Sequence, residues 1–264
     1  MQTGPWRVVR KLLAVFALMP LLGCANSGTA PEAAVPDEAP PAVRAAECRW
    51  ATGAITIDGK ADEAAWAKAQ VLQDFAVFWQ NRKAKTPTKA RLLWDEQYLY
   101  FTAEMEDSDL YADVKEHNGM TWNDDVFELF FKPSEDKLQY WEFQVNALNT
   151  QLELFLSSRG SGGYRRFGPL TKYGMESAVK LQGTLNKWED KDTGWTVEGR
   201  IPWKAFQSAG GKPKAGAKWS FALCRYDYST AFDRPELSSS APLTQPDFHR
   251  YEDYGMLTFV GPEK

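Results

Sequence analysis

Alternating apolar and polar side chains along several segments constrain the fold of this chain more than any other feature. Residues 98–106 place an apolar side chain at every second position, at Leu99, Phe101, Ala103 and Met105. Residues 126–131, 141–146 and 151–156 follow the same rule. A period of two is typical of a β-strand with one buried face. With turn residues between the segments, the chain is predicted to be all-β, an antiparallel β-sandwich with one or two short helices.

The last two of these segments also predict a polar face. Glu142, Gln144 and Asn146 alternate with the apolar residues of one segment, and Gln151 and Glu153 alternate with the leucines of the next. We expect these polar side chains to lie together on one face of the sheet. Amides and carboxylates can exchange hydrogen bonds with hydroxyl groups, so this face has the composition that a sugar site needs.

The stretch from Trp122 to Glu128 places an indole six residues before a carboxylate. Because Phe127 and Leu129 are expected to face the core, Glu128 points to the opposite face. A sugar ring could stack on Trp122 while its hydroxyls bond to Glu128. The alternative is that Trp122 covers the core and that Glu128 pairs with an arginine, as buried charges usually do.

The charge balance argues against two classes of partner. The chain carries 31 basic and 35 acidic residues, a net charge of −4. The first 23 residues hold three basic residues and no acid, so the remainder has 28 against 35, or −7. Such a surface disfavours nucleic acid and anionic lipid. The two histidines, His117 and His249, are too few for a multi-histidine metal centre.

The N-terminus is predicted to be an export signal. Three basic residues precede an apolar run over residues 12–22, which is too short to span a bilayer. The run ends at Leu21-Leu22-Gly23-Cys24, which resembles the bacterial lipobox. Residues 1–23 are therefore expected to be a lipoprotein signal peptide, with Cys24 lipidated. The alternative is an uncleaved N-terminal anchor.

The sequence after Cys24 predicts a tether and one folded domain. Residues 24–46 are rich in Ala, Pro and Glu and lack an apolar period, which is typical of a flexible linker. Residues 47–264 then form a single β-sandwich domain. Ala25, the residue after Cys24, resembles that of lipoproteins sent to the outer membrane, so we expect a lipid-anchored protein of the bacterial cell envelope.

The two remaining cysteines, Cys48 and Cys224, leave two interpretations. In an exported protein they could form a disulfide. Cys224 lies in a predicted core strand, so a buried free thiol is equally consistent with the sequence.

Three features are expected near the start of the domain. Asp58 and Gly59 form a turn, and Asp62 caps a short helix through Lys68 that buries Trp66. Residues 71–79 are predicted to form a strand.

The motifs of the domain, taken in order, resemble those of carbohydrate-binding module family 9, which is related to the DOMON group. The resemblance covers about residues 50–260 and rests on six motifs, Ile55-x-Ile57-Asp58-Gly59-x-x-Asp62-Glu63-x-x-Trp66, Leu93-Trp94-Asp95-Glu96-x-Tyr98-Leu99-Tyr100, Trp122-x-x-Asp125-x-x-Glu128, Phe143-x-Val145-Asn146, Gly194-Trp195-x-Val197-Glu198-x-x-Ile201 and Tyr254-Gly255-x-Leu257.

The resemblance implies a jelly-roll type of sandwich and a sugar held between two aromatic rings. By position, the rings would be Trp122 and Phe248. The polar ligands would be Glu128, Gln144, Asn146 and Gln245. The xylanase modules of the family carry Trp where Phe248 stands and Arg where Gln144 stands, so the sugar, or its affinity, can differ here.

The resemblance also implies structural calcium, for which the oxygens of Asp58 and Asp62 are candidate ligands. Both residues could equally serve only the turn and the helix cap.

Three functions fit these observations. The first is a lipid-anchored, non-catalytic protein that binds an oligo- or polysaccharide and acts with secreted glycoside hydrolases in polysaccharide catabolism. The second is a glycoside hydrolase-associated enzyme domain that uses Asp124, Asp125 or Glu128. Hydrolysis needs two carboxylates across one bond, and Asp124 and Asp125, as sequence neighbours, would point apart on a strand. The third is a surface domain that binds a protein partner and no sugar.

Overall fold

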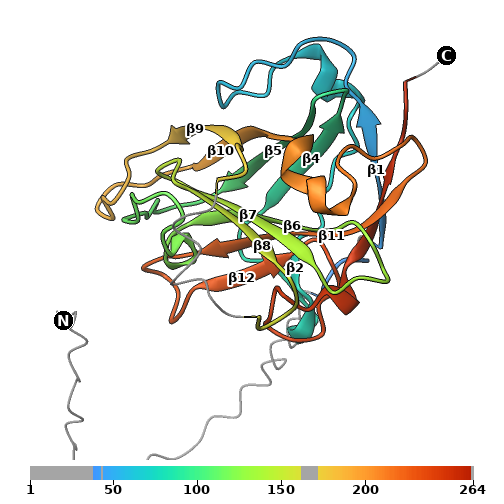
Figure 1. Ribbon diagram of the computed structural model, residues 1–264. Coiled ribbons are helices and arrows are strands. Elements are labelled where there is room, and N and C mark those ends of the chain that lie inside the picture. The colour runs from blue at the N-terminus through green and yellow to red at the C-terminus, as the bar shows by residue number, and fades with distance from the viewer. Residues whose placement is uncertain (1–37, 43, 162–171, 263–264) are drawn as a thin grey trace, which may run out of the picture. The chain divides into compact units, whose positions relative to one another are not determined.

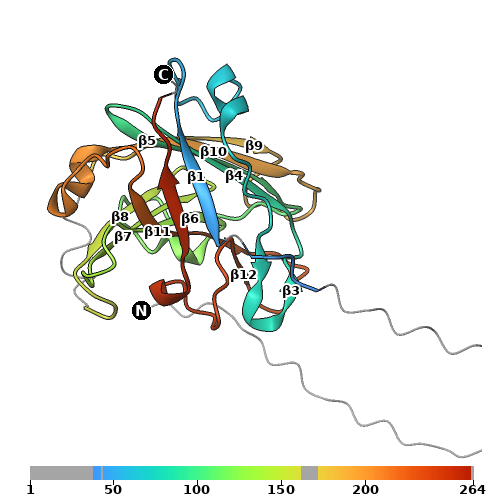
Figure 2. The ribbon, with the colours of Figure 1, turned by 90° about the vertical axis from the view of Figure 1, so that its right-hand side faces the viewer.

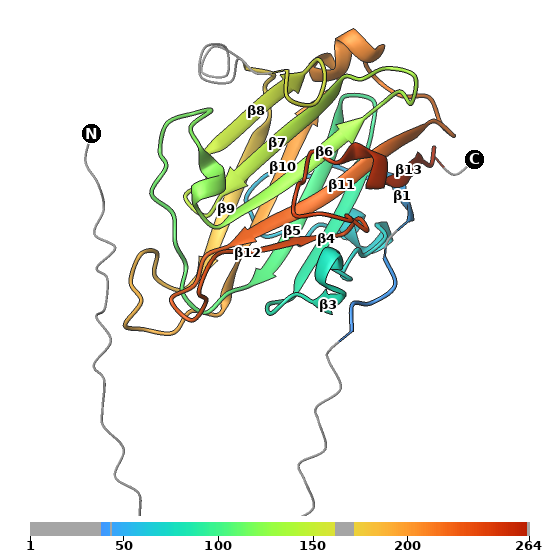
Figure 3. The ribbon, with the colours of Figure 1, turned by 90° about the horizontal axis from the view of Figure 1, so that it is seen from below.

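The structure is a computed structural model that describes residues 38–42, 44–161 and 172–262. It confirms the predicted β-sandwich: two stacked sheets account for nearly all of the regular structure (Figure 3). The expected signal peptide, Cys24 and the tether as far as residue 37 lie outside the described residues.

The first sheet is built around strand β11. Its order is β8 (Gln151–Leu156), β7 (Tyr140–Asn146), β6 (Val126–Lys132) and β11 (Lys218–Asp227). Along its other edge, β11 pairs first with β13 (Gly255–Phe259) and then with β12 (Glu236–Ser239). Two short strands, β2 (Ala76–Val77) and β3 (Arg82–Lys83), continue beyond β12.

The second sheet contains β4 (Thr88–Trp94), β5 (Tyr98–Glu106), β10 (Gly194–Pro202) and β9 (Glu176–Gln182), in that order (Figure 1). Strand β1 (Ala45–Trp50) joins the two sheets. Its first residues pair with β13, and Arg49 and Trp50 pair with β4. Figure 2 shows β1 and β13 running side by side between the layers.

Both pairings of β1 are parallel, so the expected antiparallel arrangement is wrong for this strand and holds for the other named pairs. A strand that leaves one sheet and enters the other serves as an edge partner for both, which removes two exposed edges at once. The strand starts at Ala45, two residues before the expected domain boundary at Glu47.

The core between the sheets follows the predicted alternation. The buried cluster takes Phe127, Leu129 and Phe131 from β6 and Trp141, Phe143 and Val145 from β7. It also takes Leu99, Phe101, Ala103 and Met105 from β5. A one-residue shift in any of these strands would turn its apolar side chains away from the core, so the register is strongly specified.

Strand β8 departs from the predicted polar face. Gln151 and Glu153 stand opposite Val145 and Phe143, on the core side of the sheet, whereas Leu154 stands opposite Glu142 on the outer side. The buried carboxylate of Glu153 accepts hydrogen bonds from the backbone N–H groups of Tyr173 (3.1 Å) and Met175 (2.9 Å). Those donors are distant in sequence, so the alternation of β8 alone wrongly predicted that its polar residues face outward.

The segment before β4 also differs from expectation. A 3-10 helix, η1 (Ala64–Lys68), buries Trp66 as predicted, but Glu63 precedes it and makes no side-chain cap, so Asp62 is not the cap. The indole of Trp66 donates to Glu198 (3.0 Å). Residues 71–79 do not form one strand: Leu72 makes a single bridge to Ala90, and only β2 follows.

The other helical turns are short. They are η2 (Phe78–Gln80), η3 (Thr121–Asn123), η5 (Trp203–Ala209) and η6 (Tyr251–Asp253). Within the described ranges, no helix is long and apolar enough to cross a membrane.

Cys48 and Cys224 are both buried free thiols, so the disulfide interpretation is wrong. Cys48 belongs to the core between the sheets, and Cys224 belongs to a separate apolar cluster that includes Phe130 and Phe248. Burial raises the pKa of both thiols well above the usual value.

Trp141 tests the assignment of the core face. Its ring is fully buried against Phe155 and Phe206, and its indole N–H donates to the carbonyl oxygen of Ala205 (3.0 Å). Trp141→Ala should lower the free energy of unfolding by roughly 3–5 kcal/mol, because the substitution leaves a large cavity. Urea denaturation measures this change. Trp188→Ala, at a ring that is 66% exposed, is the matched control and should change it by less than about 0.5 kcal/mol. A loss at Trp141 as small as that of the control would contradict the assignment.

Candidate functional site

The outer face of the first sheet carries a cavity of about 430 Å³. Strands β6, β7, β8 and β11 form its floor, and the loop that precedes η6 forms one wall. A cavity of this size is in the range of small-molecule sites. Its lining residues are Trp122, Glu128, Phe130, Glu142, Gln144, Leu154, Leu156, Tyr226, Pro246, Asp247, Phe248 and His249.

The register of β6 against β7 brings the polar residues of the floor together. Glu128 stands opposite Gln144, and Phe130 stands opposite Glu142. Because residues of like parity share a face, Glu128, Gln144 and Glu142 all point outward while their neighbours enter the core. The leucines of β8 flank them, so the predicted polar face is a narrow strip on two strands.

Hydrogen bonds fix Gln144 between its neighbours. Its amide nitrogen donates to Glu142 Oε1 (2.5 Å), and its oxygen accepts from the hydroxyl of Thr121 (2.5 Å). His249 Nδ1 lies 2.9 Å from the Tyr140 hydroxyl and 4.0 Å from Glu142 Oε2. Gln144 therefore has both ends of its amide engaged within the protein.

The two carboxyl groups of the floor are poorly solvated. Glu128 is 2% exposed and Glu142 is 4% exposed. Burial raises the pKa of Glu128 well above its usual range, and the nearby Glu142 raises it further. Burial also raises the pKa of Glu142, against a smaller opposing effect of His249. Glu128 Oε1 has no hydrogen-bond partner, and no arginine among the described residues pairs with Glu128, contrary to the alternative interpretation.

The two aromatic residues implied by the resemblance line the same cavity but differ in exposure. Trp122, in η3, is half-buried. Phe248 is only 4% exposed and packs against Tyr226 and Phe130, with ring centroids at 5.3 and 6.3 Å. Phe248 is therefore a packed part of the wall rather than a ring that stands clear of it.

Two of the expected polar ligands lie elsewhere. The side-chain nitrogen of Asn146 donates to Asp124 Oδ2 (2.6 Å) and to the carbonyl oxygen of Val114 (2.9 Å), and its oxygen accepts from the backbone of Leu148 and Thr150. Asn146 thus holds the loop together. Gln245 is exposed and is not among the residues that line the cavity.

The sequence-based interpretation assigned no binding role to several residues of the cavity. Glu142 lay on the predicted polar face and could have been chosen from its alternation alone. Tyr226, Asp247 and His249 had no comparable signal, because they reach the cavity from β11 and from an irregular loop.

Asp124 and Asp125, proposed as alternative catalytic carboxylates, both bind backbone amides. Asp124 accepts from the N–H groups of Asp113 (3.0 Å) and Val114 (3.1 Å). Asp125 accepts from Tyr111 (2.6 Å) and Tyr228 (2.7 Å). These contacts hold the loops around the cavity, and neither residue lines it.

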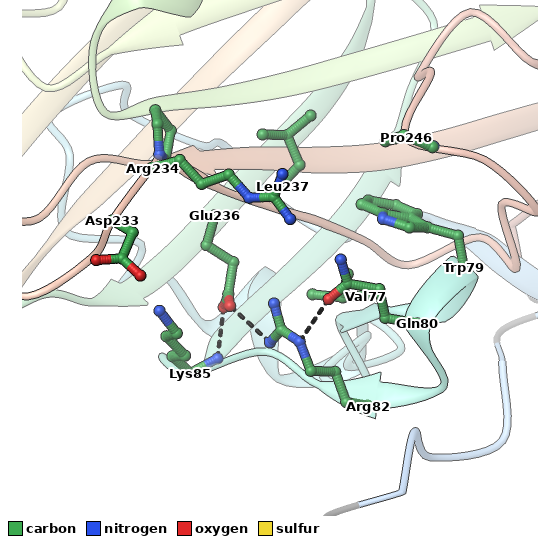
Figure 4. A pocket seen from close by; sticks show the side chains of 11 residues that line it. Val77, Trp79, Gln80, Arg82, Lys85, Asp233, Arg234, Glu236, Leu237 and Pro246 are labelled. Carbon is green, nitrogen blue, oxygen red and sulfur yellow. Dashed lines mark hydrogen bonds and ion pairs between the residues drawn. The ribbon is translucent and has the colours of Figure 1, made fainter.

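A second cavity, of about 390 Å³, adjoins the first and shares Pro246 with it. Figure 4 shows Glu236 at its centre, with Arg82 and Lys85 beside it. The carboxylate of Glu236 accepts from Arg82 Nη1 (2.6 Å) and from the backbone N–H of Lys85 (2.5 Å). This buried carboxylate is therefore satisfied by the protein itself.

The candidate calcium ligands Asp58 and Asp62 do not belong to a cluster of three or more acidic, His or Cys ligands among the described residues. The carboxylate of Asp58 is bound by Lys60 Nζ (2.6 Å), and Asp62 is exposed. Among the described residues, such a cluster is formed only by Asp107, Asp125 and Asp227, whose ligand atoms lie within 4.8 Å of one another.

The guanidinium of Arg225 occupies that carboxylate cluster. Arg225 Nη2 lies 3.0 Å from Asp107 and 3.4 Å from Asp227. Asp227 Oδ1 has no partner, but Asp125 is engaged by two backbone amides and Asp107 by Arg225. An arginine in this position supplies the positive charge that a cation would, so the set does not fit calcium, which takes six to eight oxygen ligands.

Comparison with known proteins gives a consistent assignment. A family model described as "Carbohydrate family 9 binding domain-like" matches residues 57–262. Among curated proteins, the chain is similar to endo-1,4-beta-xylanase A of Thermotoga maritima, with 30% identity over 160 residues, 59% of this chain. It is also similar to exoglucanase XynX of Acetivibrio thermocellus, with 27% identity over 168 residues, 57% of this chain. The matches cover only 13% and 15% of these relatives' lengths.

Solved structures share the fold at low sequence identity. A carbohydrate binding module family 9 from Caldicellulosiruptor kristjanssonii in complex with cellotriose matches with a TM-score of 0.57 and 17% identity, over 83% of this chain and 95% of that one. A structure from Bacteroides uniformis matches with a TM-score of 0.62 and 16% identity, over 82% and 99% of the two chains.

The carboxylate cluster predicts a pH dependence of stability. Burial, and then the charge of Asp227, raise the pKa of Asp107 from 3.8 to about 6. Between these values the folded state binds more protons than the unfolded state, so stability falls as pH rises from about 4 to 6. Since one pKa unit corresponds to about 1.4 kcal/mol, the contribution of Asp107 is on the order of 1–3 kcal/mol. In urea denaturation at several pH values, Asp107→Asn should show a smaller fall across this range than the wild type.

The control for this prediction is Asp136→Asn, which removes an exposed carboxylate and should leave the wild-type profile unchanged. Identical pH profiles for Asp107→Asn and the wild type would contradict the assigned shift.

Proposed function

Because this chain belongs to the carbohydrate family 9 binding domain-like family, we propose that it binds a carbohydrate in the cavity on the outer face of the first sheet. One observation carries the proposal: the half-buried ring of Trp122 and the unpartnered carboxylate of Glu128 line the same cavity. A ring that can cover the apolar face of a pyranose and an acceptor that lacks a donor are complementary to the two kinds of surface that a sugar presents.

The energetics favour moderate affinity. Stacking a sugar on Trp122 and the cavity wall removes on the order of 100 Å² of apolar surface from water, worth roughly 2–3 kcal/mol. Each hydrogen bond to the floor adds about 0.5–1.5 kcal/mol, and a bond to the ionised form of Glu128 adds more. After the cost of immobilising the ligand, the sum corresponds to micromolar to millimolar binding.

The relatives indicate the setting in which such binding is useful. Two are named xylanase and exoglucanase, and the structural neighbours from Caldicellulosiruptor kristjanssonii are complexes with cellotriose and glucose. We infer a role in polysaccharide degradation, in which this protein holds a glycan while secreted glycoside hydrolases cut it.

Hydrolysis by this domain itself is the second candidate, because Glu128 and Glu142 are both buried carboxyls beside one cavity. The two residues point from adjacent strands toward the same side of the sheet. A glycosidase places its two carboxyls on either side of the scissile bond, so this arrangement favours holding a sugar over cleaving it. Release of reducing sugar from xylan or cellulose by the purified protein would favour the enzyme.

Attachment to the membrane is a separate proposal, supported by the lipobox-like residues 21–24. Lipidated Cys24 would hold the domain at the cell envelope, with the Ala- and Pro-rich segment as a spacer. Since a single acyl chain gives only marginal anchoring, stable attachment needs more than one chain.

Trp122→Ala tests the binding site. Loss of the indole removes a large part of the stacking energy, so binding of cello- or xylo-oligosaccharides should weaken by roughly 10- to 100-fold, or about 1.4–2.8 kcal/mol. Isothermal titration calorimetry measures the affinity, and the melting temperature checks the fold. Trp188→Ala removes an exposed indole outside the cavity and should bind like the wild type. Equal affinity in both variants, or no glycan binding by the wild type, would contradict the site or the function.

Cys24→Ser tests the anchor. Without the thiol, lipid cannot be attached, so the variant should accumulate as unprocessed precursor or as soluble protein. Cell fractionation and gel mobility distinguish these forms from the wild type. If the variant still fractionates with membranes at the processed size, lipidation of Cys24 is wrong. Cys48→Ser, at a buried thiol within the domain, is the control for loss of a cysteine.

A further inference from the structure

Buried carboxylates in this protein are generally satisfied by donors of the chain itself. Glu198 accepts from the backbone N–H groups of Asp58 and Gly59 and from the indole of Trp66. Glu236, Asp125 and Asp124 likewise accept at least two bonds each, as described above. Because an unpaired buried carboxylate is costly, this pattern is what folding alone would require.

Glu128 is the exception that faces the cavity. It is 2% exposed, Oε1 has no partner, and none of the hydrogen bonds described for the chain reaches its carboxylate. Its cross-strand neighbour Gln144 cannot serve as donor, because its amide nitrogen is turned to Glu142. Strand β6 thus holds the Glu128 carboxylate beside the cavity, and no described residue donates a hydrogen bond to it.

A second buried carboxyl group lies next to Glu128. Glu142 shares the floor with Glu128, and its Oε2 lies 4.0 Å from the histidine nitrogen, beyond hydrogen-bond distance. Asp247, on the loop, adds a third carboxyl to the lining. Among the described residues that line the cavity there is neither lysine nor arginine, and His249 is the one imidazole. A cation with several N–H donors would complement these carboxyl groups.

We propose that the sugar bound in this cavity carries a protonated amine, which donates to Glu128 and to Glu142 Oε2. This inference rests on the proposed function and names its class of ligand: an amino sugar of the glucosamine type. An ammonium group has three N–H donors in a compact shape, and it matches two carboxylates on adjacent strands better than a hydroxyl does. Trp122 supplies the apolar surface for the ring.

The titration of the site supports this choice. Burial raises the pKa of both Glu128 and Glu142, so in the absence of a cation these carboxyls retain protons above their usual range. An ammonium group would favour the charged carboxylates, whereas a neutral sugar would leave two poorly solvated carboxyls to share protons. The two carboxyl groups of the floor therefore favour an amino sugar over a neutral sugar of the same shape.

Three oligosaccharides of one linkage test the proposal. Hexamers of β-1,4-linked glucosamine, N-acetylglucosamine and glucose differ only in the substituent at carbon 2, an ammonium, an acetamide or a hydroxyl. Calorimetry with the purified wild type should show the glucosamine hexamer binding about 10- to 100-fold more tightly than the other two, as expected for charge-assisted hydrogen bonds. Equal or tighter binding of the glucose or acetylated hexamer would overturn this inference and leave the proposed function standing. Binding of none of the three, nor of xylo-oligosaccharides, would overturn both.

Variants of the two glutamates locate the effect. Glu128→Gln and Glu142→Gln keep the side-chain shape and remove one charge each, so each should reduce the preference for the glucosamine hexamer toward unity. The double variant Glu135→Gln, Asp136→Asn removes two exposed carboxylates outside the cavity and should retain the preference. If the control loses the preference to the same extent, the attraction is a general effect of net charge and the site is wrong. The wild-type series decides alone if a glutamine variant does not fold.

Discussion

The two sheets are joined at one end by a cluster of aromatic rings, and the position of the cavity depends on this cluster. Trp219 of β11 contacts Phe206 and Phe259, with centroids 4.9 Å apart in each case. Trp94 of β4, in the other sheet, reaches the same cluster at 5.4 Å from Phe259. Rings of this size dominate the energy of burial, and their edge-to-face contacts restrict how the sheets can slide. The inner face of the first sheet is therefore fixed, and so is the direction of the side chains on its outer face.

That constraint explains why the central part of the site could be predicted from the sequence. In β6 and β7 the residues that enter the core are large and apolar without exception, so the alternation assigns Glu128, Glu142 and Gln144 to the outer face without ambiguity. The spacing from Glu128 also points to Trp122, which lies in η3, just before β6, and does line the cavity. Where every core-facing residue of a strand is large and apolar, the sequence of that strand alone predicts which of its side chains face outward.

The failures occur where partners come from distant parts of the chain. Glu153 looks like an outward residue because glutamate is seldom buried, yet backbone amides of residues 173 and 175 satisfy it on the core side. Asn146 has the right face for a ligand, but its amide nitrogen donates to Asp124, and its oxygen accepts from the backbone N–H of Leu148 in the turn after β7. Arg225 sits in a core strand because Asp107, which follows β5, pairs with it from a distant part of the chain, together with Asp227 of its own strand. No local pattern reports such tertiary partners.

The acidic floor of the cavity imposes a cost on the folded state that the surrounding core makes tolerable. Glu128 lies between Phe127 and Leu129 on a strand that is paired on both sides, with β11 and β7. The backbone of β6 cannot shift to give the carboxylate more water without displacing those two core residues, so the unfavourable burial persists. A ligand that donates to Glu128 removes this cost, and it can do so only in the folded chain. Its binding free energy therefore adds to stability by linkage. Because the core residues of β6 prevent the strand from shifting, this strand can keep an unsatisfied carboxylate in position for a ligand.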